Sequence, residues 1–151
     1  MEIRKGTLKD LEAIAAVEAA CFPAAEAATA EEFAGRLLFE QGELVAFVDG
    51  FCTDWPDLTD EMYADASLHR ENGAWQMIFG VNTIPACRRQ GYAGQLLQQA
   101  IADARAQGRK GLVLTCKEAL VHYYAKFGFV NEGVSGSTHG GVVWYQMRLK
   151  F

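Results

Sequence analysis

The sequence predicts an α/β fold with a mixed, mostly antiparallel central sheet flanked by helices. Short apolar runs bounded by turn residues are typical of strands, whereas other segments repeat apolar residues at helical spacing. Along the chain these elements follow the order β-α-α-β-β-loop-β-α-β-α-β-β, which favours an α/β domain with a mixed sheet. At 151 residues the chain has the size of a single domain, expected to span residues 1–151.

The composition excludes several classes of protein. With 14 basic and 19 acidic residues, the net charge of −5 argues against a nucleic-acid groove and is compatible with a cationic substrate. No apolar signal segment opens the chain and no run is long enough to span a membrane, so a cytoplasmic location is expected. The four cysteines form no C-x-x-C pair, so we expect no metal site and interpret Cys21, Cys52, Cys87 and Cys116 as buried, reduced thiols.

The N-terminal segment is expected to contain one strand and two helices. The strand covers Glu2–Lys5, and a capping pattern at Thr7 opens the first helix. A second cap at Thr29 opens a helix whose apolar face includes Leu37 and Leu38. The small residues between the two helices are typical of a linker, or of a segment that folds over a substrate.

A hairpin and a long loop are expected next. Gln41-Gly42 separates a strand over Leu37–Glu40 from one over Leu44–Thr53. Asp54–Gly73 is polar, acidic and aromatic without a sustained period, which predicts a loop. A loop of that length in a compact domain is functional or disordered, and its aromatic residues favour a function.

The C-terminal half is expected to alternate strands and helices. A central strand over Trp75–Ile84 ends at Pro85, which cannot donate to a sheet ladder. An amphipathic helix follows over Gln95–Gln107 and ends at Gly108. The remaining expected elements are a buried strand over Gly111–Cys116, a helix over Lys117–Lys126, and strands over Phe129–Gly133 and Val142–Leu149.

The turn between the central strand and this helix has the composition of a phosphate site. Arg88–Gly94 reads R-R-Q-G-Y-A-G, and a glycine-bearing turn directs backbone N–H groups toward the positive end of the helix dipole. The chain has neither G-x-G-x-x-G nor G-x-x-x-x-G-K-[ST], which excludes the dinucleotide and nucleoside-triphosphate fingerprints. From the turn alone, Arg88 and Arg89 are either pyrophosphate ligands or solvated surface charges.

Two stretches resemble the landmarks of the GNAT acetyltransferases. Arg88–Ala93 matches the Q/R-x-x-G-x-G/A acetyl-CoA signature in its strand–turn–helix context, and Ala119–Phe129 resembles the second landmark, a helix with an aromatic-Tyr pair followed by Gly-Phe. The resemblance implies a GNAT-like acyl-CoA N-acyltransferase fold and acetyl-CoA as the acyl donor. It also implies that pantetheine lies along the strand before the turn and pyrophosphate at the turn. The residues implied for the donor are Phe79, Gly80, Val81, Asn82, Thr83, Arg88, Arg89, Gln90, Gly91, Tyr92, Ala93 and Gly94.

Within that superfamily the chain most resembles the arylalkylamine N-acetyltransferases and their bacterial relatives. The similar stretches include Leu44–Gly50, Ser67–Arg70 and Cys116–Val121. This resemblance implies an enzyme that transfers acetyl from acetyl-CoA to the primary amine of a small substrate by direct attack. A ping-pong route through Cys116 or Cys87 is the alternative, although neither has a histidine nearby in sequence to act as base.

Tyr124 matches the tyrosine that the family places near the coenzyme sulfur as general acid. A phenol has an ordinary pKa of about 10, so it is protonated at neutral pH and can donate to a departing thiolate. The alternative interpretation is that Tyr123 and Tyr124 form an aromatic core pair on a short helix.

The general base is absent from the position where the animal relatives have it. Those enzymes carry an H-x-H pair on the central strand, and the matching residues here are Met77 and Phe79, neither of which accepts a proton. With Trp55, they suggest a small hydrophobic amine pocket. Alternative proton acceptors are the histidines His69 and His139 and the acidic loop residues Asp57, Asp60 and Glu61.

Two other functions stay open at this point. Loss of the histidine pair is compatible with a non-catalytic acyl-CoA-binding or regulatory module. Acetylation of a protein or peptide amine is the other alternative. Nothing in the sequence decides between a monomer and a homodimer.

Overall fold

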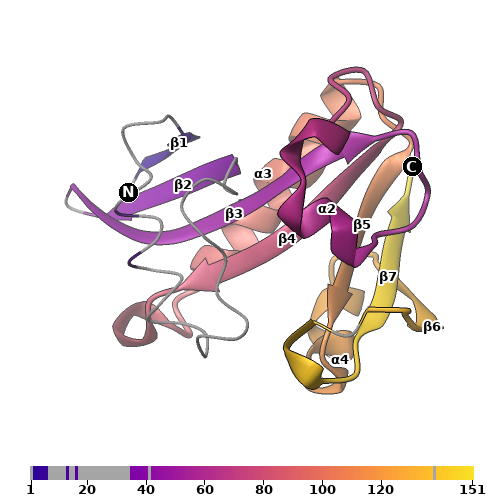
Figure 1. Ribbon diagram of the computed structural model, residues 1–151. Coiled ribbons are helices and arrows are strands. Elements are labelled where there is room, and N and C mark those ends of the chain that lie inside the picture. The colour runs from indigo at the N-terminus through magenta and orange to yellow at the C-terminus, as the bar shows by residue number, and fades with distance from the viewer. Residues whose placement is uncertain (1, 7–12, 14–15, 17–34, 41, 138) are drawn as a thin grey trace.

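Seven strands form one sheet in the residues that the computed structural model describes, which are 2–6, 13, 16, 35–40, 42–137 and 139–151 (Figure 1). Their order is β1-β2-β3-β4-β5-β7-β6, and every neighbouring pair is antiparallel except β4 and β5. The mixed, mostly antiparallel α/β class is therefore confirmed. The strands are β1 (Glu2–Lys5), β2 (Gly35–Glu40), β3 (Glu43–Thr53), β4 (Trp75–Thr83), β5 (Gly111–Cys116), β6 (Val130–Val134) and β7 (Tyr145–Lys150).

The described helices are short apart from α3. They are α2 (Asp60–Ala64), α3 (Tyr92–Ala106) and α4 (Val121–Ala125), with 3-10 turns η3 (Ala66–Leu68), η4 (Pro85–Cys87), η5 (Glu118–Leu120) and η6 (His139–Gly141). The prediction of an irregular loop over residues 54–73 was wrong, because this segment contains α2 and η3. Its buried Leu58 and Met62 pack on the sheet, and a five-residue helix is too short to show a period in sequence.

The expected second helix was wrong at its C-terminal end. Leu37 and Leu38 lie in β2, opposite Phe47 and Ala46 of β3, so the hairpin pairing prevails over the helical spacing. The rest of that helix, the linker before it and most of the first helix lie outside the described residues. The hairpin itself is confirmed, because β2 and β3 pair antiparallel.

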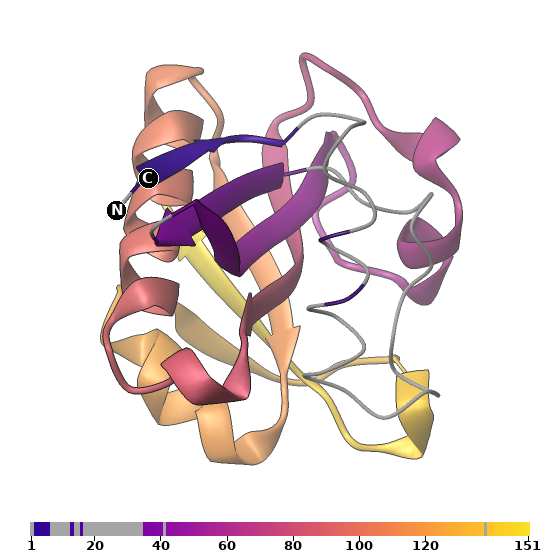
Figure 2. The same cartoon turned by 90° about the vertical axis from the view of Figure 1, so that its left-hand side faces the viewer.

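Helices cover both faces of the sheet (Figure 2). α3 packs its buried Leu96 and Leu97 against one face, together with Ile78 of β4. α2 lies on the opposite face (Figure 2), where it joins a second group of buried residues that we call the α2-side cluster. No helix in the described part of the chain is long and apolar enough to cross a membrane. The α2-side cluster consists of Phe51, Leu58, Met62, Trp75, Met77 and Val113.

Candidate functional site

A left-handed turn leads into α3. Gly91, the N-cap residue, has φ 82°, and Arg89 has φ 66°, a conformation that costs a residue other than glycine roughly 1–2 kcal/mol. Because Gly91 serves as the cap, α3 begins at Tyr92, earlier than the predicted start at Gln95. An α-helix leaves its first amide groups without intrahelical acceptors, so this end of α3 can receive an anion.

β4 and β5 are paired over their first residues and then diverge, as Figure 1 shows. In the described structure, β4 pairs with β5 only from Trp75 to Ile78, after which β5 continues along β7. The other edge of β4 stays paired with β3 up to Thr83, and a register shift leaves Phe79 as a bulge. Beyond Ile78, β4 therefore presents backbone polar groups that β5 does not bind, as an extended ligand requires.

A cavity of about 450 Å³ joins the turn, the free edge of β4 and α4. Eight of the twelve residues implied for the donor line it, so the structure brings most of that set together. Of the others, Phe79 and Gly80 form the bulge region, Gln90 is exposed, and Gly94 lies against Phe127. The lining comprises Val81, Asn82, Thr83, Arg88, Arg89, Gly91, Tyr92 and Ala93 from the donor set, with Cys87, Leu120, Tyr123 and Tyr124.

Tyr124 is both a core residue and a wall of this cavity. It is buried and makes edge-on ring contacts with Tyr123 and Phe129, with ring centroids 5.2 Å and 6.2 Å away. Burial, and to a lesser degree the neighbouring Cys116, raises the pKa of its phenol well above the ordinary value. Tyr124 therefore carries its proton throughout the physiological range, as a proton donor must.

The cysteines differ from the expectation in part. Cys52 and Cys116 are buried free thiols as predicted, whereas Cys87 is partly exposed on the cavity wall. Burial raises the pKa of Cys116 to about 11, so Cys116 stays protonated, and a thiol is a much weaker nucleophile than a thiolate. Cys21 lies outside the described residues.

Aromatic side chains surround the bulged residue Phe79 on the α2 side of the sheet. Phe79 packs against Phe51 and Tyr63, with ring centroids 4.9 Å and 4.7 Å apart. Met77 is fully buried in the α2-side cluster and Trp55 is 60% exposed and lies apart from it, so the predicted pocket of Met77, Phe79 and Trp55 was wrong. Tyr63 takes the place of Trp55, and its hydroxyl lies 3.2 Å from Thr115 Oγ1.

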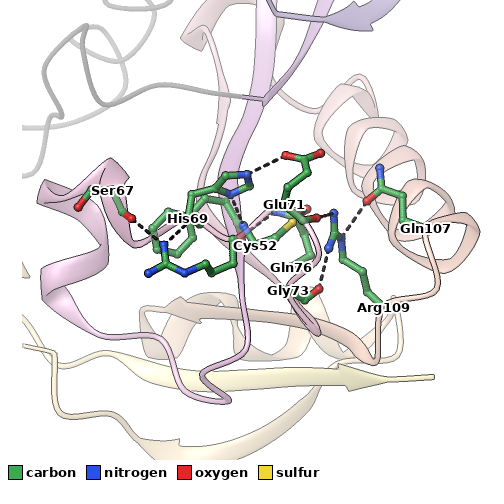
Figure 3. A network of polar contacts seen from close by, with 10 residues as sticks. Cys52, Ser67, His69, Glu71, Gly73, Gln76, Gln107 and Arg109 are labelled. Atoms are coloured by element: carbon green, nitrogen blue, oxygen red, sulfur yellow. Dashed lines mark hydrogen bonds and ion pairs between the residues drawn. The ribbon is translucent and has the colours of Figure 1, made fainter.

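His69 lies outside the cavity beside Tyr124 and has other contacts. Its Nδ1 accepts a hydrogen bond from the Cys52 amide at 3.0 Å, and its Nε2–H donates to Glu71 at 2.9 Å (Figure 3). It lines a separate cavity of about 330 Å³ together with Gln107, just beyond the last turn of α3. His69 does not line the cavity beside Tyr124, and both of its ring nitrogens are engaged, so it is not assigned as the base.

The acidic candidates are also engaged elsewhere. Asp57 forms a 3.0 Å ion pair with Arg148, and Asp60 accepts a hydrogen bond from Ser137. Both line a surface cavity between α2 and β6 that is separate from the one beside Tyr124. Glu61 is exposed, and the side chain of His139 is outside the described part of the structure.

Sequence reasoning missed Asp49 and Tyr63. Asp49 lies in β3, opposite Gly80, and is only 7% exposed. The available signal was an acidic residue directly after the apolar run Leu44–Val48 and in the middle of the expected strand over Leu44–Thr53, since ionised side chains are rarely buried without a compensating partner.

The strand–turn–helix site has the sequence pattern of a known family. The profile of the Acetyltransferase (GNAT) family matches residues 8–129. This chain belongs to the GNAT family. The resemblance read from Arg88–Ala93 and Ala119–Phe129 is therefore confirmed at the level of the superfamily.

A curated GNAT relative is similar over most of this chain. Serotonin N-acetyltransferase of Mesocricetus auratus is 32% identical over 111 residues, which make up 73% of this chain and 52% of the relative. The matched part thus spans about half the length of that protein. This similarity agrees with the resemblance to the arylalkylamine group.

Solved structures share the fold at low sequence identity. A GphF GNAT-like decarboxylase in complex with isobutyryl-CoA superposes with a TM-score of 0.84 at 20% identity, covering 99% of both chains. A GNAT family acetyltransferase from Brucella melitensis in complex with acetyl-CoA gives 0.64 at 19% identity, covering 99% of this chain and 87% of that one. Such identities establish the fold only.

Proposed function

We propose that this protein is an acetyl-CoA-dependent N-acetyltransferase that acts on the primary amine of a small arylalkyl substrate. The observation that carries the proposal is the cavity in which the turn before α3, the unpaired edge of β4 and Tyr124 meet. These three features supply what the reaction needs, namely an anion site, a binding edge for an extended arm and a proton donor.

The donor is assigned along this cavity from the turn inward. The turn residues Arg88–Gly94 bind the pyrophosphate through backbone amides and the two arginines. The strand residues Phe79–Thr83 bind the pantetheine arm, whose amides pair with backbone groups on the β5-facing edge of β4. Two relatives that share the fold carry an acyl-CoA, which supports this assignment.

The acceptor is assigned to the aromatic side of the bulge. Phe79 lies within ring-contact distance of both Phe51 and Tyr63, and Phe79 and Tyr63 are partly exposed. Such a surface suits an aryl group because aromatic rings stack favourably. The serotonin N-acetyltransferase relative supports the same class of acceptor.

Transfer is by direct attack of the amine on the thioester, with Tyr124 donating to the departing thiolate. The raised pKa of Cys116 removes the buried thiol as a nucleophile, which favours direct attack over an acyl-enzyme. The raised pKa of Tyr124 keeps the donor protonated.

The test is an amine-panel assay that follows release of free CoA from acetyl-CoA. We expect turnover with tryptamine and phenethylamine and none with polyamines or with peptides bearing a free N-terminus. Turnover of polyamines or peptides alone would refute the arylalkyl acceptor. Tight acetyl-CoA binding by calorimetry, without turnover of any amine, would refute the enzyme and support the non-catalytic acyl-CoA module.

A further inference from the structure

The histidine pair of the animal relatives has no counterpart here, yet a buried carboxylate lies at the β4 bulge. Asp49 of β3 is directly opposite Gly80, the residue that follows the bulged Phe79. Its side chain is on the α2 side of the sheet, because strand residues alternate and Asp49 shares a face with Phe51 of the α2-side cluster. Asp49 is also among the residues that line the cavity beside α3, which His69 borders.

Gly80 makes room for this carboxylate over β4. A Cβ atom at position 80 would lie 2.7 Å from Asp49 Oδ1 and 3.0 Å from Asn82 Nδ2. The carboxylate of Asp49 and the side-chain amide of Asn82 therefore both lie next to the backbone of Gly80, which has no side chain of its own. Asn82 lines the cavity assigned to the donor, so the carboxylate of Asp49 lies beside a wall residue of that cavity, close to where β4 leaves β5.

Aromatic rings adjoin the carboxylate on the acceptor side. Phe51 is two residues along the same face of β3 and contacts Phe79 at the bulge, and Phe79 contacts Tyr63. Burial and, to a lesser degree, the negative charges of Asp49 and Asp60 raise the pKa of Tyr63 to about 12, so the phenol lies within electrostatic reach of Asp49. A carboxylate beside aromatic faces is a favourable environment for an alkylammonium group.

We propose that Asp49 binds the ammonium group of the acceptor and is the general base that removes its proton. This inference rests on the proposed function and names the base that the family resemblance leaves unassigned. Its position at the junction of the donor cavity and the aromatic surface brings the nitrogen to the thioester.

The proton balance is complete with the groups named. The ammonium gives one proton to the Asp49 carboxylate, and the nitrogen lone pair forms the C–N bond to the thioester carbonyl carbon. The C–S bond breaks and the thiolate takes the proton of Tyr124. The nitrogen loses its second proton, which restores the Tyr124 phenol through water, and Asp49 releases its proton to solvent. The products are the amide, CoA–SH and one proton.

The test compares two acceptors of nearly equal shape. Phenethylamine is an ammonium ion at neutral pH, whereas its isostere O-benzylhydroxylamine is neutral and needs no deprotonation before attack. In Asp49→Asn we expect kcat/KM for phenethylamine to fall by roughly 100-fold or more, the usual contribution of a general base, and the value for O-benzylhydroxylamine to fall by less than about tenfold. The uncatalysed reaction of the hydroxylamine is subtracted.

Two further variants separate charge from fold. Gly80→Ala displaces the carboxylate without removing it and is expected to lower kcat/KM for phenethylamine more than for O-benzylhydroxylamine, because any effect on the pantetheine arm is shared by both acceptors. Asp103→Asn, whose carboxylate accepts from Gln99 on α3, is the matched control and is expected to keep the parent rates with both acceptors. Melting temperatures of all variants are measured alongside.

Binding of phenethylammonium by calorimetry, with a non-hydrolysable acetyl-CoA analogue present, distinguishes this inference from the proposed function. Binding that weakens at least tenfold in Asp49→Asn, with or without turnover in the parent, supports the ammonium site. Equal loss of both acceptors in Asp49→Asn, or unchanged rates and binding, would overturn the role of Asp49 while leaving an active parent an N-acetyltransferase. Parent protein that binds no ammonium would overturn it too.

Discussion

Substitution of Gly91 by alanine allows an effect on acetyl-CoA binding to be distinguished from an effect on stability. Its φ of 82° lies in the left-handed region, and a Cβ at this position would meet nothing within 4 Å. Gly91→Ala therefore changes the backbone preference of the turn without a steric clash. Gly108, at the other end of α3, has φ 74° with the same open surroundings, and Gly42 in the β2–β3 hairpin has φ 81°. These two glycines provide matched controls.

The stability effect follows from two opposing costs. A left-handed conformation costs alanine roughly 1–2 kcal/mol. Replacing glycine reduces the entropy of the unfolded chain and returns about 0.4–1 kcal/mol. The net loss is about 1 kcal/mol for each of the three variants, which lowers Tm by roughly 2–4 °C in a chain of this size.

The binding effect is expected at Gly91 alone. Alanine there favours a turn in which the amides at the start of α3 no longer converge on the pyrophosphate. Loss of one hydrogen bond to a charged group costs about 1.5–3 kcal/mol, or roughly tenfold to hundredfold in the Kd of acetyl-CoA. Calorimetry and thermal unfolding on the three variants measure both effects. Equal Kd values for all three, with equal Tm losses, would refute the assignment of the turn.

Three further predictions concern single side chains. Tyr124→Phe should lower kcat by roughly 100-fold or more without changing acetyl-CoA affinity, because the proton donor is lost. Burial raises the pKa of Tyr124, so kcat of the parent protein should show no decline due to Tyr124 below about pH 10. Cys116→Ala should keep turnover, and intact-mass spectrometry of the parent should reveal no acetyl-enzyme. The hydrogen bond from Arg148 lowers the pKa of Glu132, so its stabilisation is present above the ordinary carboxyl pKa of about 4.3 and is lost as the pH falls through the lower folded value. Glu132→Gln should accordingly lower the urea midpoint at pH 7 but not at pH 2–3.

Local patterns predicted the part of the site that lies on contiguous residues. The strand, turn and helix around Arg88–Gly94 are encoded by neighbouring residues, and the order of strands and helices from β4 onward follows the hydrophobic periods. The start of α3 differed because Gly91 acts as the N-cap, a role that glycine often fills but that the sequence alone does not assign to it.

Nonlocal pairing determined what the sequence could not reveal. Leu37 and Leu38 fit a helical spacing, yet they lie in β2, which pairs with β3 in the sheet. Asp49 reaches the bulge only because the β3–β4 register shifts by one residue between Ile78 and Gly80. Tyr63 joins Phe79 through a helix of five residues, too short to be recognised from its period. Each of these features depends on contacts between residues well separated along the chain.

A crystal structure of the complex with acetyl-CoA tests the central assignment most directly. We predict the pyrophosphate at the amides that follow Arg89, the pantetheine arm along the edge of β4 beyond Ile78, and the acetyl group beside Gly80. Coenzyme bound instead in the cavity beside His69, or with its pyrophosphate away from the start of α3, would contradict the account.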